Sequence, residues 1–422
     1  MNKQQTHSVY HGKWSIPVHN STDKVIEYKE CMGTLAYDGE RIRLDVYPDF
    51  SLSPIGFEYI EVLYGYTNTG YQFTLFGLNW RNLQFGVSVS FSVTEVILGR
   101  KVESLSAPLY DECVVSYPNL RNLIPPKLSK VELGDKTTLE ITTEGIAPLF
   151  QMEIEEGVVI SLCPTNNFNF ERFNYTYTED TKLRIVSNKP ISINNFRQII
   201  KRFTQFLSVA LYAQQTPISI EFKVSQEDSK VADKLLFGIE KSQEPSMIPL
   251  LKYELLKDKF DILLKKWFEN YEQIAPICSY LIRSLEKSVY DAPKFLIVAQ
   301  AVDGYFKRFV NGKDGKNTQQ YEHQIQKLLK HFKGVKAIQE CSIDAEVMAH
   351  SRNKYSHLIP DGETKSVEKA VSGIDLYVLT KKTIVLLTCC ILDYIGLTTE
   401  EINQCIENSA VENIVYVARR NE

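Results

Sequence analysis

Arg352 and His357 are the pair of side chains in this sequence best suited to cleaving a phosphodiester bond. They lie in the segment SRNKYSHLIPDG, residues 351–362, with four residues between them. An imidazole titrates near neutral pH, so it can take a proton from a ribose 2′-hydroxyl or protonate a leaving 5′-oxygen. A guanidinium stays charged and binds phosphate oxygens in a fork, so it can stabilise the charge that develops at phosphorus. Such a pair needs no metal ion, and we predict no cofactor.

The spacing of the pair poses a geometric problem. The turn signal PDG at 360–362 should end the helix that we expect over 343–358. On a regular helix, Arg352 and His357 lie about 140° apart, because each residue turns the chain by about 100°. Asn353, by contrast, is an i, i+4 neighbour of His357. A long arginine stem, local unwinding or a second copy of the motif could bring the groups together. The alternative is a solvated helix end, where the helix dipole favours Arg and His.

The elements that must position this pair are helical. From about residue 250 the apolar residues recur with a period of 3.6, which predicts helices at 250–272, 276–288, 293–311, 317–332, 343–358, 367–395 and 399–418. Before about residue 240 the period is two, and aromatic and β-branched residues are frequent, which predicts antiparallel strands such as 59–68, 71–78, 85–98, 137–144 and 173–180. One helix, 194–213, interrupts this region.

We therefore predict an α+β fold in two parts. An antiparallel β-rich N-terminal domain over 1–240, with a division into two lobes near 117–128, is followed by an all-α helical bundle over 246–418. The segment 238–249 mixes charge, Ser and Pro and is the best candidate for a linker. The 422 residues suffice for two or three domains of ordinary size.

The composition is that of a globular protein, with 44% hydrophobic and 24% charged residues. A net charge of −4 does not by itself indicate binding to nucleic acid or to an anionic membrane. The eight cysteines have neither C-x-x-C nor zinc-finger spacing, which is typical of reduced thiols. The first residues lack a secretory apolar stretch, and the apolar run 383–392 is too short to span a bilayer. We expect a cytoplasmic protein without a membrane partner.

Positive charge is concentrated on the N-terminal side of the Arg352/His357 pair. Residues 307–336 carry an excess of six positive charges, in a chain that is negative overall. Such a strip can hold an RNA backbone, and the binding would weaken with added salt. The alternative is an ordinary solvated face of a helix–loop–helix. The basic residues that we predict to bind RNA are Lys307, Arg308, Lys313, Lys316 and Lys354.

Other candidates are weaker. His7 and His11 have the spacing of two metal ligands on a helix, but the surrounding residues indicate loop and strand, and no third ligand is evident. His350, seven residues before His357, could be a secondary contact or a plain surface residue. The aromatic residues of 167–177 are better explained by packing than by stacking on bases. The absence of P-loop, G-x-G-x-x-G and G-x-S-x-G motifs argues against NTPase, Rossmann and α/β-hydrolase functions.

Residues 246–418 resemble the HEPN superfamily, in which an R-x-x-x-x-H motif lies in a small helical bundle. The segments AQAVDGYFKRF and HSRNKYSHL carry most of the resemblance. A β-rich region that begins HGKWSIPV, with CMGTLAYDGERIRLDVY soon after, precedes them. This order of regions resembles the ApeA-like proteins, which are bacterial anti-phage HEPN proteins.

The resemblance implies a metal-independent endoribonuclease of abortive-infection defence that cuts RNA, with tRNA a possible substrate. Arg352 would contact the scissile phosphate, and His357 would act as general acid/base, leaving a 2′,3′-cyclic phosphate and a 5′-hydroxyl. Asn353 would orient the site, and Asp303 would position Arg352 or His357. Two motifs would meet across a homodimer interface, and the N-terminal domain would control activation, with a phage-derived trigger as a possible partner.

Two other functions fit the same residues. One is a non-catalytic HEPN-type module for RNA or nucleotide binding or for dimerisation, with a ligand-binding β-sandwich in front of it. The other is a toxin that a separate nucleotidyltransferase-type partner neutralises.

Overall fold

The computed structural model describes residues 8–19, 25–47, 59–84, 88–126, 130–133, 139–142, 147–171, 174–224, 232–245, 248–285, 292–310, 320–360 and 364–419. The chain divides into two compact units. The first comprises Met1–Leu120, Pro125–Lys201 and Thr216–Lys241, and the second comprises Arg121–Ile124, Arg202–Gln215 and Ser242–Glu422.

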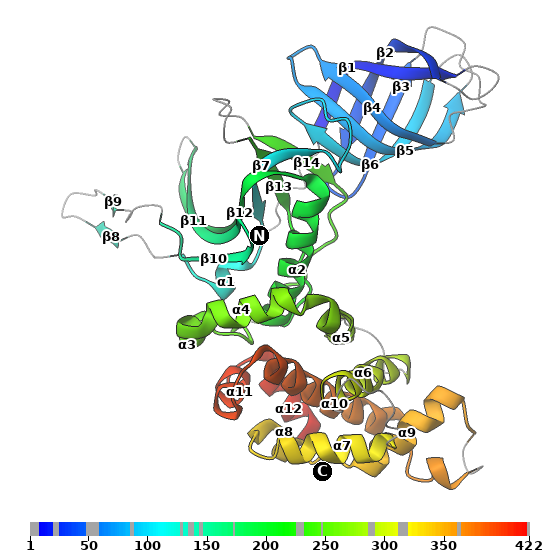
Figure 1. The fold of residues 1–422 in the computed structure, drawn as a ribbon, viewed down its shortest axis with the longest axis vertical. Helices are drawn as coiled ribbons and strands as arrows, with labels where there is room; N and C mark the ends of the chain where they lie inside the picture. The colour runs from blue at the N-terminus through cyan, green and yellow to red at the C-terminus, as the bar shows by residue number, and fades with distance from the viewer. Residues whose placement is uncertain are drawn as a thin grey trace. The chain divides into compact units, whose positions relative to one another are not determined.

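The first strands of the first unit close into a small antiparallel barrel, coloured blue in Figure 1. These strands are β1 (Ser8–His19), β2 (Val25–Tyr37), β3 (Ile42–Tyr47), β4 (Tyr59–Thr67), β5 (Gln72–Gln84) and β6 (Ser88–Leu98). Neighbouring strands follow the order β6-β3-β2-β1-β4-β5, and a second pairing of β5 with β6 closes the ring. Alternate side chains point inward, which is why the strands show a period of two.

Trp14 on β1 is a fully buried residue of the barrel core, and it packs against glycine on both neighbouring strands. A Cβ atom added at Gly33 on β2 would lie 2.7 Å from Trp14 Cδ1. Gly65 on β4 is paired with Trp14 in the sheet, and a Cβ there would overlap Cε3 of the indole. The indole therefore occupies space that a side chain would take at either position.

We expect Gly65→Ala to destabilise the barrel by about 1–3 kcal/mol, because a closed, packed core has no room into which the indole can shift. Thermal unfolding followed by the β-sheet circular dichroism signal would measure this loss. Trp14→Phe makes space at the same point, so the two substitutions together should cost less than the sum of their separate effects. Strictly additive losses would contradict the proposed clash.

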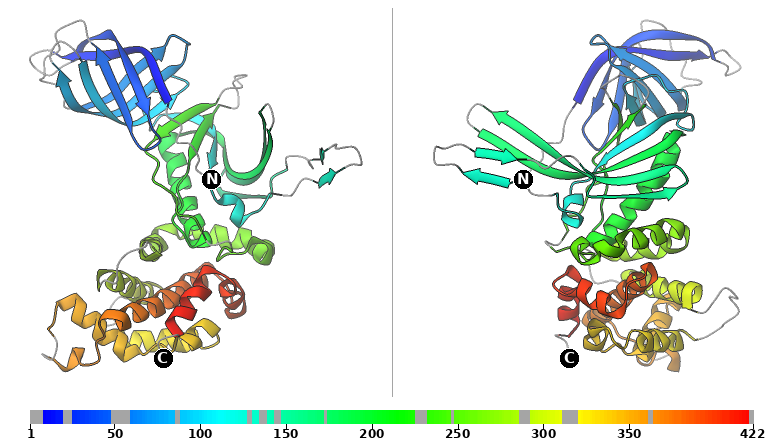
Figure 2. Two further views of the ribbon diagram at one scale, coloured as in Figure 1. Left: turned by 180° about the vertical axis from the view of Figure 1, so that it is seen from behind. Right: turned by 60° about the vertical axis from the view of Figure 1, so that its left-hand side comes forward.

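The sheet continues beyond the barrel through β14 (Asp233–Phe237), which pairs with β6. The order of the further strands is β10-β11-β12-β7-β13-β14. Helix α2 (Ile193–Leu211) lies alongside this sheet in both views of Figure 2, and the ring of Phe196 lies 5.7 Å from that of Phe222 on β13. The strands are β7 (Pro108–Ser116), β10 (Phe150–Glu155), β11 (Val158–Glu171), β12 (Asn174–Ser192) and β13 (Ser219–Lys223), with a separate hairpin of β8 (Lys130–Leu133) and β9 (Leu139–Thr142).

The second unit is helical, and α10 (Gly373–Ile395) forms its centre, since residues 383–392 are buried without interruption. The apolar run in the sequence is therefore a core helix, and among the described residues no helix is long and apolar enough to cross a membrane. The other helices are α1 (Leu120–Leu123), α3 (Tyr253–Leu256), α4 (Phe260–Glu269), α5 (Tyr271–Leu285), α6 (Ala292–Tyr305), α7 (Tyr321–His331), α8 (Lys336–Cys341), α9 (Ala345–His357), α11 (Thr399–Ile406) and α12 (Ala410–Arg419). A π-helical turn, η2 (Phe306–Val310), continues α6.

The α+β fold in two parts, antiparallel β followed by a helical bundle, is confirmed. Several predicted helix limits were wrong. The helix expected over 399–418 is two helices, because Asn408 adopts a left-handed φ of 60° between α11 and α12. Pro276 does not begin a helix but lies inside α5, and the break falls instead at Asn270, whose side chain donates to the Lys266 carbonyl at 3.0 Å.

Candidate active site

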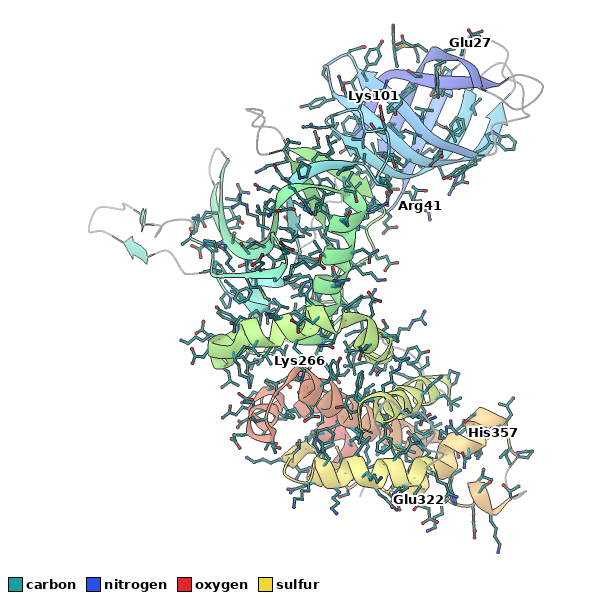
Figure 3. The ribbon with its side chains drawn as sticks, in the orientation of Figure 1. Glu27, Arg41, Lys101, Lys266, Glu322 and His357 are labelled. Atoms are coloured by element: carbon teal, nitrogen blue, oxygen red, sulfur yellow. The ribbon has the colours of Figure 1, made fainter. Side chains whose placement is uncertain are left out.

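Helix α9 carries both members of the Arg/His pair. Its N-terminus is capped by Asp344, whose Oδ1 accepts from the backbone N–H groups of Glu346 at 2.8 Å and Val347 at 3.1 Å. The helix ends at His357, because Leu358 adopts a left-handed φ of 51°. His357 is thus the last helical residue and is exposed, and Figure 3 labels it at the end of α9.

Arg352 is partly buried and lies over an aromatic ring. Its Cζ atom is 5.6 Å from the ring centroid of Tyr321, the first residue of α7. Tyr321 is itself buried, and its hydroxyl donates to the carbonyl of Ala299 on α6 at 3.1 Å. The ring and its hydrogen bond therefore form a fixed platform for the guanidinium, which a cation–π contact favours.

Asp303 on α6 is buried beside this platform, where its Oδ2 accepts from Lys307 Nζ at 2.8 Å. The pKa of the Tyr321 hydroxyl is raised above its ordinary value, first by burial and then by the nearby charge of Asp303, while Arg352 opposes the shift. Asp303, Tyr321 and Arg352 are thus electrostatic neighbours. Within the described ranges, however, no ion pair joins Asp303 to Arg352 or His357, so any effect of Asp303 on them acts through Tyr321 or through space.

The inner side of α9 is tied to the segment just before α10. Ser351 Oγ accepts a hydrogen bond from the backbone N–H of Val371 at 3.1 Å. The Tyr355 hydroxyl donates a hydrogen bond to the Val371 carbonyl at 2.8 Å. His350 Nδ1 accepts from the backbone N–H of Lys369 at 3.1 Å, so this imidazole is engaged away from His357. These bonds fix the rotation of α9. Arg352 lies about 100° around the helix from Ser351, whereas His357 lies on the same side of the helix as His350, about two turns further along.

The basic residues predicted to bind RNA have varied surroundings. Lys307 pairs with Asp303, and Arg308 Nη1 donates to the carbonyl of Gln273 at 2.9 Å, although both side chains are exposed. Lys354 is partly buried, with its Nζ 5.5 Å from the ring centroid of Tyr355. Lys313 and Lys316 lie outside the described residues.

The predicted members of the site are only partly brought together in one chain. Because α9 is helical up to His357, that imidazole and the Arg352 guanidinium leave the helix in different directions. In the part of the chain that the structure describes, neither His357 nor Asn353 makes a side-chain hydrogen bond or ion pair. The arrangement offers one exposed acid–base group and one cation that is held against a ring, and phosphodiester cleavage uses groups of both kinds.

Sequence reasoning missed Tyr321, Ser351 and Tyr355. Ser351 and Tyr355 have the i, i+4 spacing of one helix face, and this spacing could have indicated that both side chains contact the same neighbouring segment. Tyr321 stands 31 positions before Arg352, and nothing in that interval indicates the contact. Across the described residues, no three side chains of His, Cys, Asp or Glu gather in a way that could hold a metal ion.

The comparison with known families gives two matches. The family model of the ApeA N-terminal domain 1 matches residues 9–267, which is more than half of the chain. The chain belongs to the ApeA family. A second model, the Apea-like HEPN, matches residues 296–401. The resemblance to ApeA-like HEPN proteins of anti-phage defence is thereby confirmed. No curated protein and no solved structure matches the chain significantly.

The two matches divide this ApeA-family chain within its helices. The N-terminal match extends past the strands into α4, whereas the HEPN match begins in α6 and ends in α11. The HEPN match therefore includes α9 with Arg352 and His357, as well as Asp303 and the Tyr321 platform.

Proposed function

We propose that this ApeA-family protein is a metal-independent endoribonuclease of anti-phage defence. The observation that carries the proposal is the exposed imidazole of His357 at the end of α9, in the HEPN-matched segment, five positions after a braced arginine. An imidazole at this place is open to a large substrate, whereas an imidazole in the bundle core would not be. RNA provides both a phosphate for Arg352 and a 2′-hydroxyl for His357.

The reaction removes a proton from the ribose 2′-oxygen and adds a proton to the leaving 5′-oxygen. The 2′-oxygen loses its proton and bonds to phosphorus, the bond from phosphorus to the 5′-oxygen breaks, and the leaving oxygen takes up a proton. The products are a 2′,3′-cyclic phosphate and a 5′-hydroxyl. Arg352 binds the phosphate oxygens, and His357 serves as acid or base. Asn353 orients the substrate, and Asp303 stabilises the platform that carries Arg352.

One exposed histidine supplies one acid–base group, and the reaction uses two. A homodimer that brings two copies of α9 around one phosphate would supply two His357 imidazoles. It would also place the Arg352 of one chain opposite the His357 of the other. We therefore include self-association in the proposal, with tRNA among the candidate substrates. An unregulated ribonuclease is toxic to its own cell, so the β-rich region would restrain it in the cytoplasm until a phage-derived trigger appears.

The nature of the product ends tests this reaction. Purified protein incubated with RNA, tRNA included, in the presence of EDTA should yield fragments with 2′,3′-cyclic phosphates and 5′-hydroxyls. The 5′ ends should accept label from polynucleotide kinase without prior phosphatase treatment. RNA from phage-infected cells that express the protein should carry the same ends. A strict need for Mg²⁺, fragments with 3′-hydroxyls, or intact RNA in both settings would contradict the proposal.

The second candidate is a non-catalytic RNA-binding module. It is favoured by the packing of Arg352 on Tyr321, which is also how a structural arginine is held. This function predicts RNA binding without cleavage and equal binding by the wild type and a His357→Ala variant.

A further inference from the structure

We propose that the exposed face of α7 binds the backbone of the RNA substrate and that His331 is one of its phosphate contacts. This inference rests on the proposed function, and it adds the path of the strand on either side of the cut. It also assigns a role to a histidine outside the R-x-x-x-x-H motif.

Helix α7 has two distinct sides. Tyr321, Gln324, Ile325 and Leu328 are buried in the bundle. The residues exposed on the opposite side are His323, Gln326, Lys327, Lys330 and His331. His323, Lys327 and His331 follow one another at i, i+4 and i+8, so they form one stripe with steps of about 6 Å along the helix. Because α7 begins at the Tyr321 platform, this stripe leads away from Arg352.

His331 is held in place by a hydrogen-bond network whose inner end, Tyr305, is buried. Its Nε2 lies 3.2 Å from Asp393 Oδ1, and the other carboxylate oxygen of Asp393 accepts from the Tyr305 hydroxyl at 3.1 Å. The side chain of Asp393 is 35% exposed and that of His331 is 56% exposed, while Tyr305 is buried. The bond to Asp393 engages Nε2, so Nδ1 is the ring atom that a ligand can contact. A group fixed in this way loses little conformational freedom when it binds a phosphate.

The charge of this face suits a polyanion. Lys327 and Lys330 are exposed on α7, and Lys333 and Lys336 are exposed at and just before the start of α8. The acidic residue of α7, Glu322, is partly buried and accepts from Gln326 Nε2 at 2.8 Å. The exposed face therefore presents several cations, the first of them six residues along α7 from the Tyr321 ring over which Arg352 lies. A nucleic-acid strand provides a matching row of phosphates.

Binding measurements on the full chain test the α7 surface separately from catalysis. The protein carries His357→Ala so that it does not cut, and a fluorescently labelled single-stranded RNA reports affinity by anisotropy over a range of salt concentrations. Lys327→Glu with Lys330→Glu should weaken binding by about tenfold or more, and the salt slope should fall by about 0.7 for each lost contact. Lys265→Glu, an exposed charge reversal on α4, is the control and should change affinity less than about twofold.

His331 needs a variant that separates binding from packing. Gln at position 331 can still donate to Asp393, so His331→Gln keeps the tie between α7 and α10 but removes the imidazole. We expect it to preserve the melting temperature and to weaken RNA binding by about threefold or more. Tyr305→Phe should lower the melting temperature, because it breaks the buried end of the same network, and should weaken RNA binding less than His331→Gln.

The outcomes are distinguishable. Unchanged affinity in the α7 variants, an equal loss with Lys265→Glu, or no RNA binding at all would overturn the α7 proposal. An acidic protein that competes for α7 while RNA does not would overturn it as well. Wild-type protein that binds RNA through α7 but never cuts it would contradict the endoribonuclease and leave the α7 surface standing. If the wild-type protein cuts RNA and the α7 variants bind RNA normally, the α7 proposal is contradicted and the endoribonuclease is supported.

Discussion

His357→Ala is expected to reduce RNA cleavage by about 10²–10⁴-fold, the usual worth of a general acid–base group. The substitution should leave the fold intact, because His357 is exposed at the end of α9 and, among the described residues, makes no side-chain hydrogen bond. Single-turnover cleavage of a defined RNA, with melting temperature and α-helical circular dichroism measured alongside, would test both statements.

Arg352→Ala should be similarly damaging, by about 10²–10³-fold, since it removes the charge that stabilises the phosphorane-like transition state. Arg352→Lys keeps a positive charge but lacks the fork, so it should retain an intermediate rate. Ser356→Ala changes the exposed residue beside His357 and serves as the control, with a rate within about twofold of the wild type. Cleavage that survives the loss of both Arg352 and His357 would rule out the R-x-x-x-x-H mechanism.

Tyr321→Leu is expected to lower kcat by about 10²-fold, because Arg352 loses the ring on which its guanidinium lies and a small misplacement of a phosphate-binding group is costly. Tyr321→Phe keeps the ring and should hold kcat within a few-fold of the wild type. It loses the hydrogen bond to the Ala299 carbonyl, which should reduce stability by about 1–2 kcal/mol.

The two Tyr321 variants together separate positioning from folding. Rates are compared well below both melting temperatures, and kcat and KM are determined separately. If Tyr321 positions Arg352, the Leu variant loses kcat while the Phe variant loses only stability. Equal falls in kcat for both variants, or a normal kcat for the Leu variant, would show that the ring has no positioning role.

Much of the local structure of this chain could be predicted from its residues. The expected helix 343–358 is α9, Ala345–His357, because Asp344 is a strong cap and the turn-forming residue types PDG follow in the sequence at 360–362. The period-two segments 59–68 and 71–78 correspond to β4 and β5. These successes share a cause, since caps, turns and side-chain periodicity act over a few residues.

The predictions failed where the structure depends on a long-range contact or on the backbone conformation of a single residue. The expected helix over 399–418 has no proline to break it, and its division depends on the left-handed backbone of Asn408. Closure of the barrel depends on pairing between β5 and β6 and between β1 and β4, and on glycines that make room for Trp14. A period of two predicts that a strand has a buried face but not which strands will be its neighbours.

The same division applies to the candidate site. The residue types of Arg352 and His357 suit phosphodiester chemistry, but their spacing fits a solvated helix end as well, so this role stays a prediction. The pairing of Asp303 with Lys307 is a local i, i+4 contact. Only the tertiary structure placed Tyr321 under Arg352, engaged His350 with Lys369, and joined His331 to Asp393 and Tyr305. Residue types indicate which side chains could take part in a reaction, and periodicity indicates which face of a helix is buried. Contacts between helices cannot be predicted in this way, because they depend on how the whole core packs.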